Sequence, residues 1–211
     1  MHVQGCEALL EKTGRTGDPM KVAVLDPSAF TPPYDHHLCK GLATQIETVR
    51  LVTSKKSFFE NQSQRPYILD SHFYKYTNSL FPDDAPESFR LAFKGCEHIW
   101  GMLRLLRTLR NFNPDIIHFQ WLPLPLVDQW FLSRLRRISP LLFTVHDSNP
   151  FHDASSSRLQ LLGANDVLVK FDRLIAHTEF TRRELQNSGI PEENISIVPH
   201  GVLPYSKPDS T

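Results

Sequence analysis

The sequence predicts an α/β fold, a doubly wound parallel sheet of Rossmann-like type. Short apolar runs rich in β-branched residues alternate about six times with stretches of helical periodicity, and the connections between them are short. Parallel strands need crossover helices, which come to lie on both faces of such a sheet. Polar residues also cluster directly after several of the apolar runs. Because ligands bind at the carboxyl ends of the strands in these sheets, the clusters mark the candidate site.

Length and composition describe a single ordinary domain. The chain has 211 residues, with 23 basic and 23 acidic side chains that cancel. No bulk attraction to nucleic acid follows from this balance, and we expect no nucleic-acid partner. The three cysteines show neither a disulfide framework nor zinc-ligand spacing, which favours a reducing cytoplasm. No apolar run approaches the ~20 residues that span a bilayer, and the N-terminus has no signal-peptide pattern.

Seven runs have the apolar, β-branched character of strands in a parallel sheet. They are 21–25, 48–53, 71–76, 115–119, 141–145, 173–176 and 195–198. The run at 71–76 lies in an aromatic-rich stretch, 54–86, which is either an acceptor-facing insertion or a segment that packs its rings against the domain edge.

Five stretches have helical periodicity or helix boundary signals. They are 34–44, 89–111, a stretch from Pro125, 155–171 after a serine run, and a stretch from Thr178 to Gly189. The apolar positions expected to face the sheet are Leu38, Leu42 and Ile46 in the first, Ile99, Leu103, Leu106 and Leu109 in the second, and Val127, Phe131, Leu135 and Ile138 in the third.

The domain organisation predicted from composition has three parts. Residues 1–19 are polar and without a sustained period, and we expect a flexible N-terminal extension. Residues 20–202 form the Rossmann-like domain. Residues 203–211 are polar and proline-bearing, as at the start of an interdomain linker.

The polar clusters carry a family resemblance. They are Pro32-Pro33-Tyr34-Asp35-His36-His37, His118-Phe119-Gln120-Trp121, Thr144-Val145-His146-Asp147 and Val198-Pro199-His200-Gly201-Val202. In this order, with "PDIIH" before the second cluster and "FDRLIAHTEFTRREL" before the last, they resemble the N-terminal domain of glycosyltransferase family 4. The resemblance covers residues 21–202. It implies the N-terminal half of the GT-B architecture, in which two Rossmann-like domains flank a cleft.

The resemblance implies a function that this chain shares with a second domain. Family members transfer a sugar from a nucleotide-sugar donor to a glycan or lipid-linked acceptor, usually with retention of anomeric configuration. Their N-terminal domain shapes the acceptor site, and a C-terminal domain, which we expect this chain to lack, binds the nucleotide. The resemblance therefore implies a hexosyltransferase-type enzyme of polysaccharide biosynthesis whose isolated N-terminal half is inactive. No bound cofactor or metal is expected, because basic residues and helix N-termini stabilise the departing diphosphate in GT-B enzymes.

Two residues after the run at 141–145 are the candidate catalytic residues. His146 matches the family histidine that contacts the donor sugar, where a neutral imidazole can orient the anomeric carbon by a hydrogen bond. Asp147 is expected to orient this loop, with a general-base role as the lesser alternative. The alternative for His146 is a strand-end histidine bonded to local backbone.

The candidate acceptor residues follow two other strands. Many family members carry paired glycines where this chain has Pro32 and Pro33, which favours side-chain contacts from Tyr34, Asp35 and His36 over a backbone cradle. The alternative is a rigid prolyl turn with Asp35 capping the helix. Gln120 and Trp121 are the second acceptor pair, since an indole face can stack on a sugar ring. A tryptophan of the core or domain edge is the alternative.

Three further features have weaker functional interpretations. His200 and Gly201 resemble the hinge between the two domains, near the donor phosphates. His118, His177 and Thr178 are expected to be structural. Arginines repeat along the stretches 104–110 and 134–137, where solvated faces are expected, although some family members sit on anionic membranes through such helices. The expected location is therefore cytoplasmic, with peripheral contact at the inner membrane face as a hypothesis.

Competing functions differ in plausibility. A non-catalytic carbohydrate-binding or partner subunit, working with a separately encoded C-terminal half, is the main alternative. A generic Rossmann oxidoreductase is disfavoured because no G-x-G-x-x-G follows the first strand. A serine hydrolase is disfavoured because G-x-S-x-G is absent.

Overall fold

The computed structural model describes residues 19–62, 64–77, 87–146 and 167–201. All but the last residue of the extension expected at 1–19, the linker expected at 203–211, most of the helix expected at 155–171, and Asp147 lie outside these residues.

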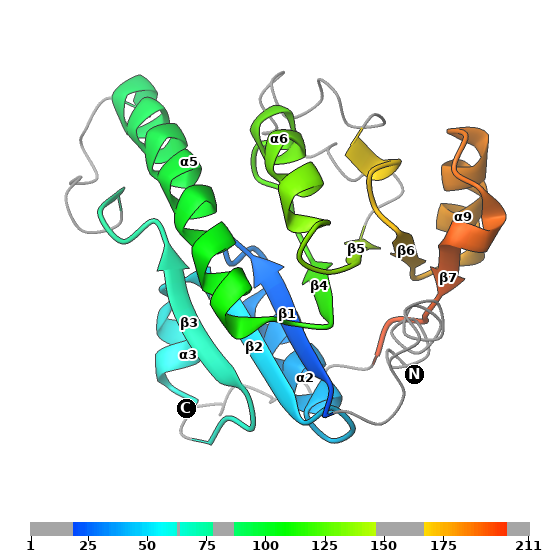
Figure 1. Cartoon of the computed structure of the whole chain (residues 1–211), viewed down its shortest axis with the longest axis horizontal. Helices are drawn as coiled ribbons and strands as arrows, with labels where there is room; N and C mark the ends of the chain where they lie inside the picture. Colours follow the sequence, from blue (N-terminus) through cyan, green and yellow to red (C-terminus); the bar gives the residue numbers. More distant parts are fainter. Residues whose placement is uncertain (1–18, 63, 78–86, 147–166, 202–211) are drawn as a thin grey trace, which may run out of the picture.

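Seven parallel strands form one sheet in the order β3-β2-β1-β4-β5-β6-β7 (Figure 1). The strands are β1 (Lys21–Asp26), β2 (Thr48–Ser54), β3 (Ile68–Phe73), β4 (Ile116–Phe119), β5 (Leu141–Val145), β6 (Arg173–Ala176) and β7 (Ile195–Ile197). The predicted fold class is confirmed. β3 begins three residues earlier than predicted, and the other six strands match their predicted runs to within one residue at either end.

Helices cover both faces of the sheet, and the chain changes face between β1 and β4. The helices α2 (Pro32–Leu42) and α3 (Ser57–Glu60) pack on one face. The helices α5 (Glu87–Phe112), α6 (Pro125–Leu135) and α9 (Glu179–Asn187) pack on the other, and a 3₁₀ turn at Glu192–Asn194 precedes β7. Figure 1 shows α5 and α6 in front of the sheet with α2 and α3 behind it. The adjacent pair β1 and β4 is therefore the topological switch point, where such sheets bind ligands.

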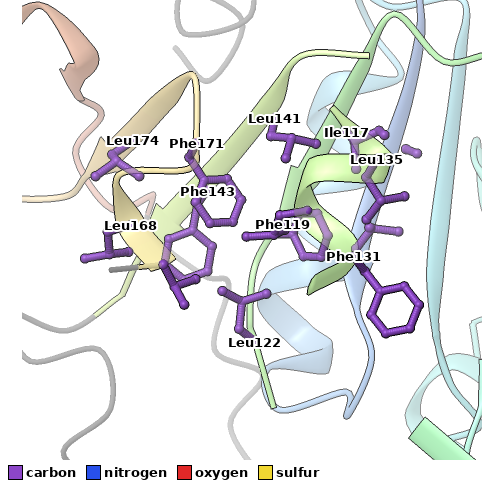
Figure 2. Packing of buried hydrophobic residues seen from close by; sticks show 14 of the residues in the cluster. Ile117, Phe119, Leu122, Phe131, Leu135, Leu141, Phe143, Leu168, Phe171 and Leu174 are labelled. Atoms are coloured by element: carbon purple, nitrogen blue, oxygen red, sulfur yellow. The ribbon is translucent and has the colours of Figure 1, made fainter. Parts of the chain in front are cut away.

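The strands divide their side chains between two apolar clusters because successive residues point to opposite faces. In β1, Val22 and Val24 join the cluster under α2, and Ala23 and Leu25 join the cluster under α5 and α6. Figure 2 shows the second cluster, where the Phe171 ring stacks on Phe143 at a centroid distance of 5.0 Å. Each fully buried ring of this kind stabilises the fold by about 1.5–3 kcal/mol.

Several boundary signals in the sequence are confirmed. Pro125 opens α6, and the Thr178 hydroxyl accepts a 3.1 Å hydrogen bond from the Thr181 amide at the start of α9. Gly189 lies just past α9 with φ +88°, a conformation that side chains disfavour. The short α3 was not predicted, since one helical turn has too few residues to show a period.

The face predicted for α5 is partly wrong. Ile99 and Leu103 were expected to be buried, but they are 42% and 50% exposed. The side chains of α5 that pack on the sheet instead form a stripe displaced by about one residue from the predicted one. The buried side chains of this stripe are His98, Met102, Leu105, Leu106 and Leu109.

Specific contacts at β3 and α6 set this rotation of α5. The His98 ring is fully buried, with Nδ1 2.7 Å from the Tyr74 hydroxyl and Nε2 2.6 Å from Asp128 Oδ1. Gly101 also faces β3, where a Cβ would lie only 2.6 Å from the buried ring of Phe73. Apolar residues occur on two neighbouring stripes of this helix, so periodicity alone could not select between them.

Gly101→Ala is expected to destabilise the domain by about 1–3 kcal/mol, because the new methyl group overpacks the ring of Phe73. Gly95→Ala is the matched control in the same helix. An added Cβ at Gly95 meets nothing within 4 Å, so the gain in helix propensity should make that variant at least as stable as the wild type. Urea unfolding of both variants measures the difference, and equal stabilities would contradict the close packing of α5 on β3.

Candidate functional site

Two loops meet at the switch point, one after β1 and one after β4. The Trp121 indole N–H donates a 3.1 Å hydrogen bond to the Thr31 hydroxyl. Its ring also lies 5.3 Å from the ring of Phe30, centroid to centroid. Trp121 therefore ties the β4 loop to the β1 loop across the point where the chain changes face, and it remains partly exposed.

A buried aspartate at the end of β1 holds the β1 loop in place. The Asp26 carboxylate accepts backbone hydrogen bonds from Phe30 at 2.7 Å and from Thr31 at 3.4 Å. Its carbonyl accepts from the Ala29 amide and from the Thr53 hydroxyl. The positions of Phe30 and Thr31, and through them that of Trp121, thus depend on a residue that is fully buried.

Three imidazoles gather at the neighbouring strand ends, and we call them the three-histidine cluster. His146 follows β5, His177 follows β6, and His200 lies three residues past β7. The ring of His177 lies 5.5 Å from that of His146 and 4.6 Å from that of His200. One ring nitrogen from each histidine lies within 4.8 Å of the other two, a spacing suited to a metal ion.

Two aromatic rings enclose the cluster. The Tyr34 ring, from the first turn of α2, lies 4.8 Å from His146 and 5.0 Å from His200. The Trp121 indole stacks on His146 with a centroid distance of 4.9 Å and an interplanar angle of 9°. Four strand ends and one helix therefore converge on His146.

A buried polar chain orients His146 from below. The Gln120 amide oxygen lies 3.0 Å from His146 Nε2, and the amide nitrogen lies 3.0 Å from His118 Nε2. His118 Nε2 is also 2.7 Å from the Thr144 hydroxyl. An amide oxygen only accepts, so His146 Nε2–H is the donor, and in a neutral ring of this tautomer the acceptor nitrogen is Nδ1.

A comparable constraint acts on His177. Its Nδ1 lies 2.8 Å from the Val198 carbonyl, which can only accept, so this nitrogen carries the proton. Burial lowers the pKa of His177, and this outweighs the opposing effect of the Val198 hydrogen bond. The ring is therefore neutral near pH 7, with its lone pair on Nε2.

Two of the predicted acceptor residues are buried beside other partners. The His36 ring lies 2.8 Å from the Tyr67 hydroxyl, and burial lowers its pKa. Asp35 is fully buried and pairs with the carboxyl group of Asp26. Their role in acceptor binding stays a prediction, whereas Tyr34, Gln120 and Trp121 lie together with His146.

The buried carboxyl groups of Asp26 and Asp35 interact, and Asp35 holds its proton to a higher pH than an exposed aspartate does. Burial raises the pKa of Asp35 well above its usual value, and the neighbouring Asp26 charge raises it further. Neither oxygen of Asp35 accepts an N–H or O–H bond from the residues the structure describes. A proton shared between the two carboxyl groups would supply the hydrogen bond that Asp26 Oδ1 and Asp35 lack within the described residues.

The raised pKa of Asp35 makes stability depend on pH. The pKa of Asp35 is raised in the folded protein, so its contribution to stability is complete below the unfolded value of about 3.9. The contribution is lost as the pH rises through the folded pKa.

Asp35→Asn removes the ionisable group, and this variant is expected to gain stability relative to the wild type between pH 4 and pH 8. Unfolding free energies at both pH values test this, with the exposed Glu184→Gln as the control for charge loss. A difference independent of pH would contradict the raised pKa of Asp35.

The remaining predicted residues have simpler positions. Pro33 is exposed in the first turn of α2, and His200 and Gly201 are exposed beyond β7. His118 is buried, as expected of a structural residue at a strand end. Thr31 and Asp26 were missed, although the position of Asp26 at the end of the first strand was a usable signal. His177 was expected to be structural, and its place in the cluster follows from the order β5-β6-β7.

Among the described helices, none has the length and apolar character needed to cross a membrane.

Comparisons with known proteins agree with this architecture. Residues 34–204 match the model of Glycosyltransferase Family 4. No curated protein matches the sequence.

Solved structures share the fold. HepE from Anabaena, in complex with UDP-glucose, is 16% identical with a TM-score of 0.59, and the match covers 87% of this chain and 44% of HepE. A glycosyltransferase from Rickettsia africae is 12% identical with a TM-score of 0.56, over 88% of this chain and 44% of that one. A UDP-N-acetylglucosamine 2-epimerase from Rickettsia bellii is 14% identical with a TM-score of 0.53, over 84% and 44%. The chain thus spans less than half the length of each.

Proposed function

The chain belongs to glycosyltransferase family 4, and from this membership we propose that it is the acceptor-binding half of a two-domain GT-B sugar transferase. The complete enzyme would transfer a sugar from a nucleotide-sugar donor to a glycan or lipid-linked acceptor, with retention of anomeric configuration. Residues 20–202 would form the acceptor domain, and the segment from 203 would lead to the donor domain. HepE, which shares the fold, was crystallised with UDP-glucose, and this supports a nucleotide-sugar donor.

One observation carries the proposal: Trp121 stacks on His146 at the switch point of the sheet. A partly exposed indole offers an apolar face to a sugar ring, and its edge is fixed by the Thr31 hydroxyl. An acceptor sugar on the outer side of Trp121 would therefore lie beside the imidazole that serves the donor sugar. Tyr34 would close the other side of this site, since its ring meets the same imidazole edge-on.

The hydrogen bonds of His146 indicate how it would act. Its Nε2–H is held by Gln120, so Nδ1 is the atom that can accept a hydrogen bond from a donor-sugar hydroxyl. Such a bond would orient the anomeric carbon toward the acceptor without moving a proton. Asp147 would orient the loop that follows His146. His200 and Gly201 would form the hinge and approach the donor phosphates when the two domains close. This mechanism uses no metal ion and no bound cofactor.

A membrane surface is proposed as the place where a lipid-linked acceptor is met. α5 begins beyond the carboxyl edge of the sheet and runs back along its face, so its first turns extend past the strand ends (Figure 1). Arg90, Arg107 and Arg110 are exposed on this helix together with large apolar side chains. The exposed apolar side chains are Phe89, Leu91, Ile99, Trp100 and Leu103. Basic and apolar groups on one helix favour binding to anionic lipid.

The chain is expected to pellet with anionic liposomes at low salt, and pelleting should fall when Trp100 and Leu103 are both changed to serine. The side chains of Trp100 and Leu103 are 59% and 50% exposed, so the substitutions should leave the fold intact. Zwitterionic liposomes are the control. If the wild-type chain stays in the supernatant with anionic lipid, the proposed membrane contact is wrong.

Activity requires the second domain, and this gives the test of the proposal. The chain alone should release no nucleotide from UDP-, GDP- or ADP-sugars. Joined to a second Rossmann-like domain encoded in frame or beside it, the protein should release nucleotide when an acceptor glycan is added. Turnover by the isolated chain would contradict the proposal that acceptor and donor are bound by two separate domains, and so would the lack of any such second domain.

A further inference from the structure

The three-histidine cluster has the composition of a transition-metal site. His146, His177 and His200 come from three consecutive strand ends, and one ring nitrogen of each lies within 4.8 Å of the other two. We propose that these three imidazoles bind a divalent ion of the zinc type at the carboxyl edge of the sheet. This goes beyond the proposed transfer reaction, which needs no metal ion.

The hydrogen bonds around the cluster favour this interpretation. Metal-binding histidines characteristically donate their second ring N–H to an oxygen acceptor, which fixes the tautomer and aims the lone pair. His146 donates through Nε2 to the Gln120 amide oxygen, and His177 donates through Nδ1 to the Val198 carbonyl. The Val198 amide is in turn bonded to the Ala176 carbonyl at 2.9 Å, which holds this acceptor in place. The fold thus holds two of the three histidines by a hydrogen bond to an oxygen acceptor.

The spacing fits a small ion after limited movement. Zn–N bonds of about 2.0–2.1 Å place tetrahedral ligand nitrogens roughly 3.4 Å apart, against at most 4.8 Å here. His200 is exposed beyond the last strand, so its side chain can rotate toward the other two rings, whose centroids lie 5.5 Å apart and must also approach each other. His146 and His177 are held by their oxygen acceptors and would move less.

The ligand set selects the class of ion. Imidazole nitrogens suit zinc, copper, nickel and cobalt, whereas magnesium and calcium prefer oxygen ligands. Three histidines leave a fourth position for water or an anionic oxygen, as in open zinc sites. An ion here would occupy the lone pair of His146 that the proposed transfer reaction uses. Zinc-type ions should therefore inhibit the complete enzyme, a consequence that rests on the proposed function.

Direct metal binding tests the site without any transferase activity. The tag-free, metal-free chain is titrated with Co²⁺ as a spectroscopic probe, and bound Co²⁺ is then displaced by Zn²⁺ in a calorimeter. We expect one equivalent bound, with visible absorption bands typical of four-coordinate cobalt. His177→Ala and His200→Ala should each weaken binding at least about 10-fold, and Gln120→Ala should weaken it by a comparable factor through the loss of orientation.

Controls separate this site from other ligands. Cys96→Ser removes the exposed free thiol and should leave the affinity unchanged. His200 is exposed, so His200→Ala should keep the fold, which thermal unfolding checks even if His177→Ala unfolds. Absence of stoichiometric binding, or binding that His200→Ala leaves intact, would overturn the proposal. Because no transfer is measured, failure here leaves the proposed function standing.

Discussion

Replacing His146 with alanine is expected to lower kcat/KM of the two-domain enzyme by about 10²–10³-fold. Removing one oriented hydrogen-bonding group at a reaction centre has effects of this size. The geometry gives the reason: Gln120 fixes the Nε2–H, Trp121 covers one ring face, and Tyr34 meets the ring edge-on. A side chain held on three sides has the fixed orientation that the proposed contact with a sugar hydroxyl would require.

The same steady-state assay distinguishes this role from a structural one. His146→Asn retains an acceptor atom near the position of Nδ1, and it should recover part of the lost rate. Gln120→Ala frees the imidazole to rotate, so an intermediate loss in kcat is expected with little change in acceptor KM. If His146→Ala retained nearly full kcat/KM while remaining folded, the assignment of this residue would be wrong.

Trp121→Ala is expected to weaken acceptor binding by about 2 kcal/mol, or roughly 30-fold, as is typical of a tryptophan that a ligand covers on binding. The indole spans the switch point, bonded to Thr31 on one side and stacked on His146 on the other. Its loss removes both a stacking face for the sugar and the link between the β1 and β4 loops. Titration of the chain with an acceptor found on a glycan array measures the change.

Trp130→Ala is the matched control for this experiment. Trp130 is 68% exposed on α6, with its ring against the guanidinium of Arg134, and its loss should leave acceptor affinity unchanged. Thr31→Val breaks only the hydrogen bond to the indole and should cause a smaller loss than Trp121→Ala. Equal affinities of the Trp121 and Trp130 variants would exclude Trp121 from the acceptor site.

The strands were predictable because a parallel sheet buries both of its faces. Its central strands read as unbroken apolar runs, and 141–145 and 173–176 were located to the residue. Helix rotation was less predictable. α5 has apolar residues on two adjacent stripes, and the buried His98 and the close approach at Gly101 select between them. Those contacts join segments far apart in the sequence, so no local pattern contains them.

The candidate site was partly predictable from the rule that ligands bind at strand ends. That rule located Tyr34, Gln120, Trp121 and His146, which the structure brings together. It could not show that Asp35, one residue from Tyr34, points into the core beside Asp26, because the face of a helix turn depends on its packing.

The three-histidine cluster could not be predicted because strand order is a property of the whole sheet. His177 and His200 are 23 residues apart in sequence, and β6 and β7 must be neighbours for their rings to lie 4.6 Å apart. The sequence placed each histidine after a strand. The pairing of β5 with β6 and of β6 with β7 makes them one site.

Ligand-observed NMR on the isolated chain tests the proposal that it is the acceptor-binding half of a sugar transferase. One sample contains the acceptor glycan selected on an array, and the other contains UDP-glucose, GDP-mannose and ADP-glucose. We expect saturation transfer to the glycan, its loss in Trp121→Ala, and no comparable transfer to the nucleotides. Strong transfer to a nucleotide sugar with none to any glycan would contradict the claim.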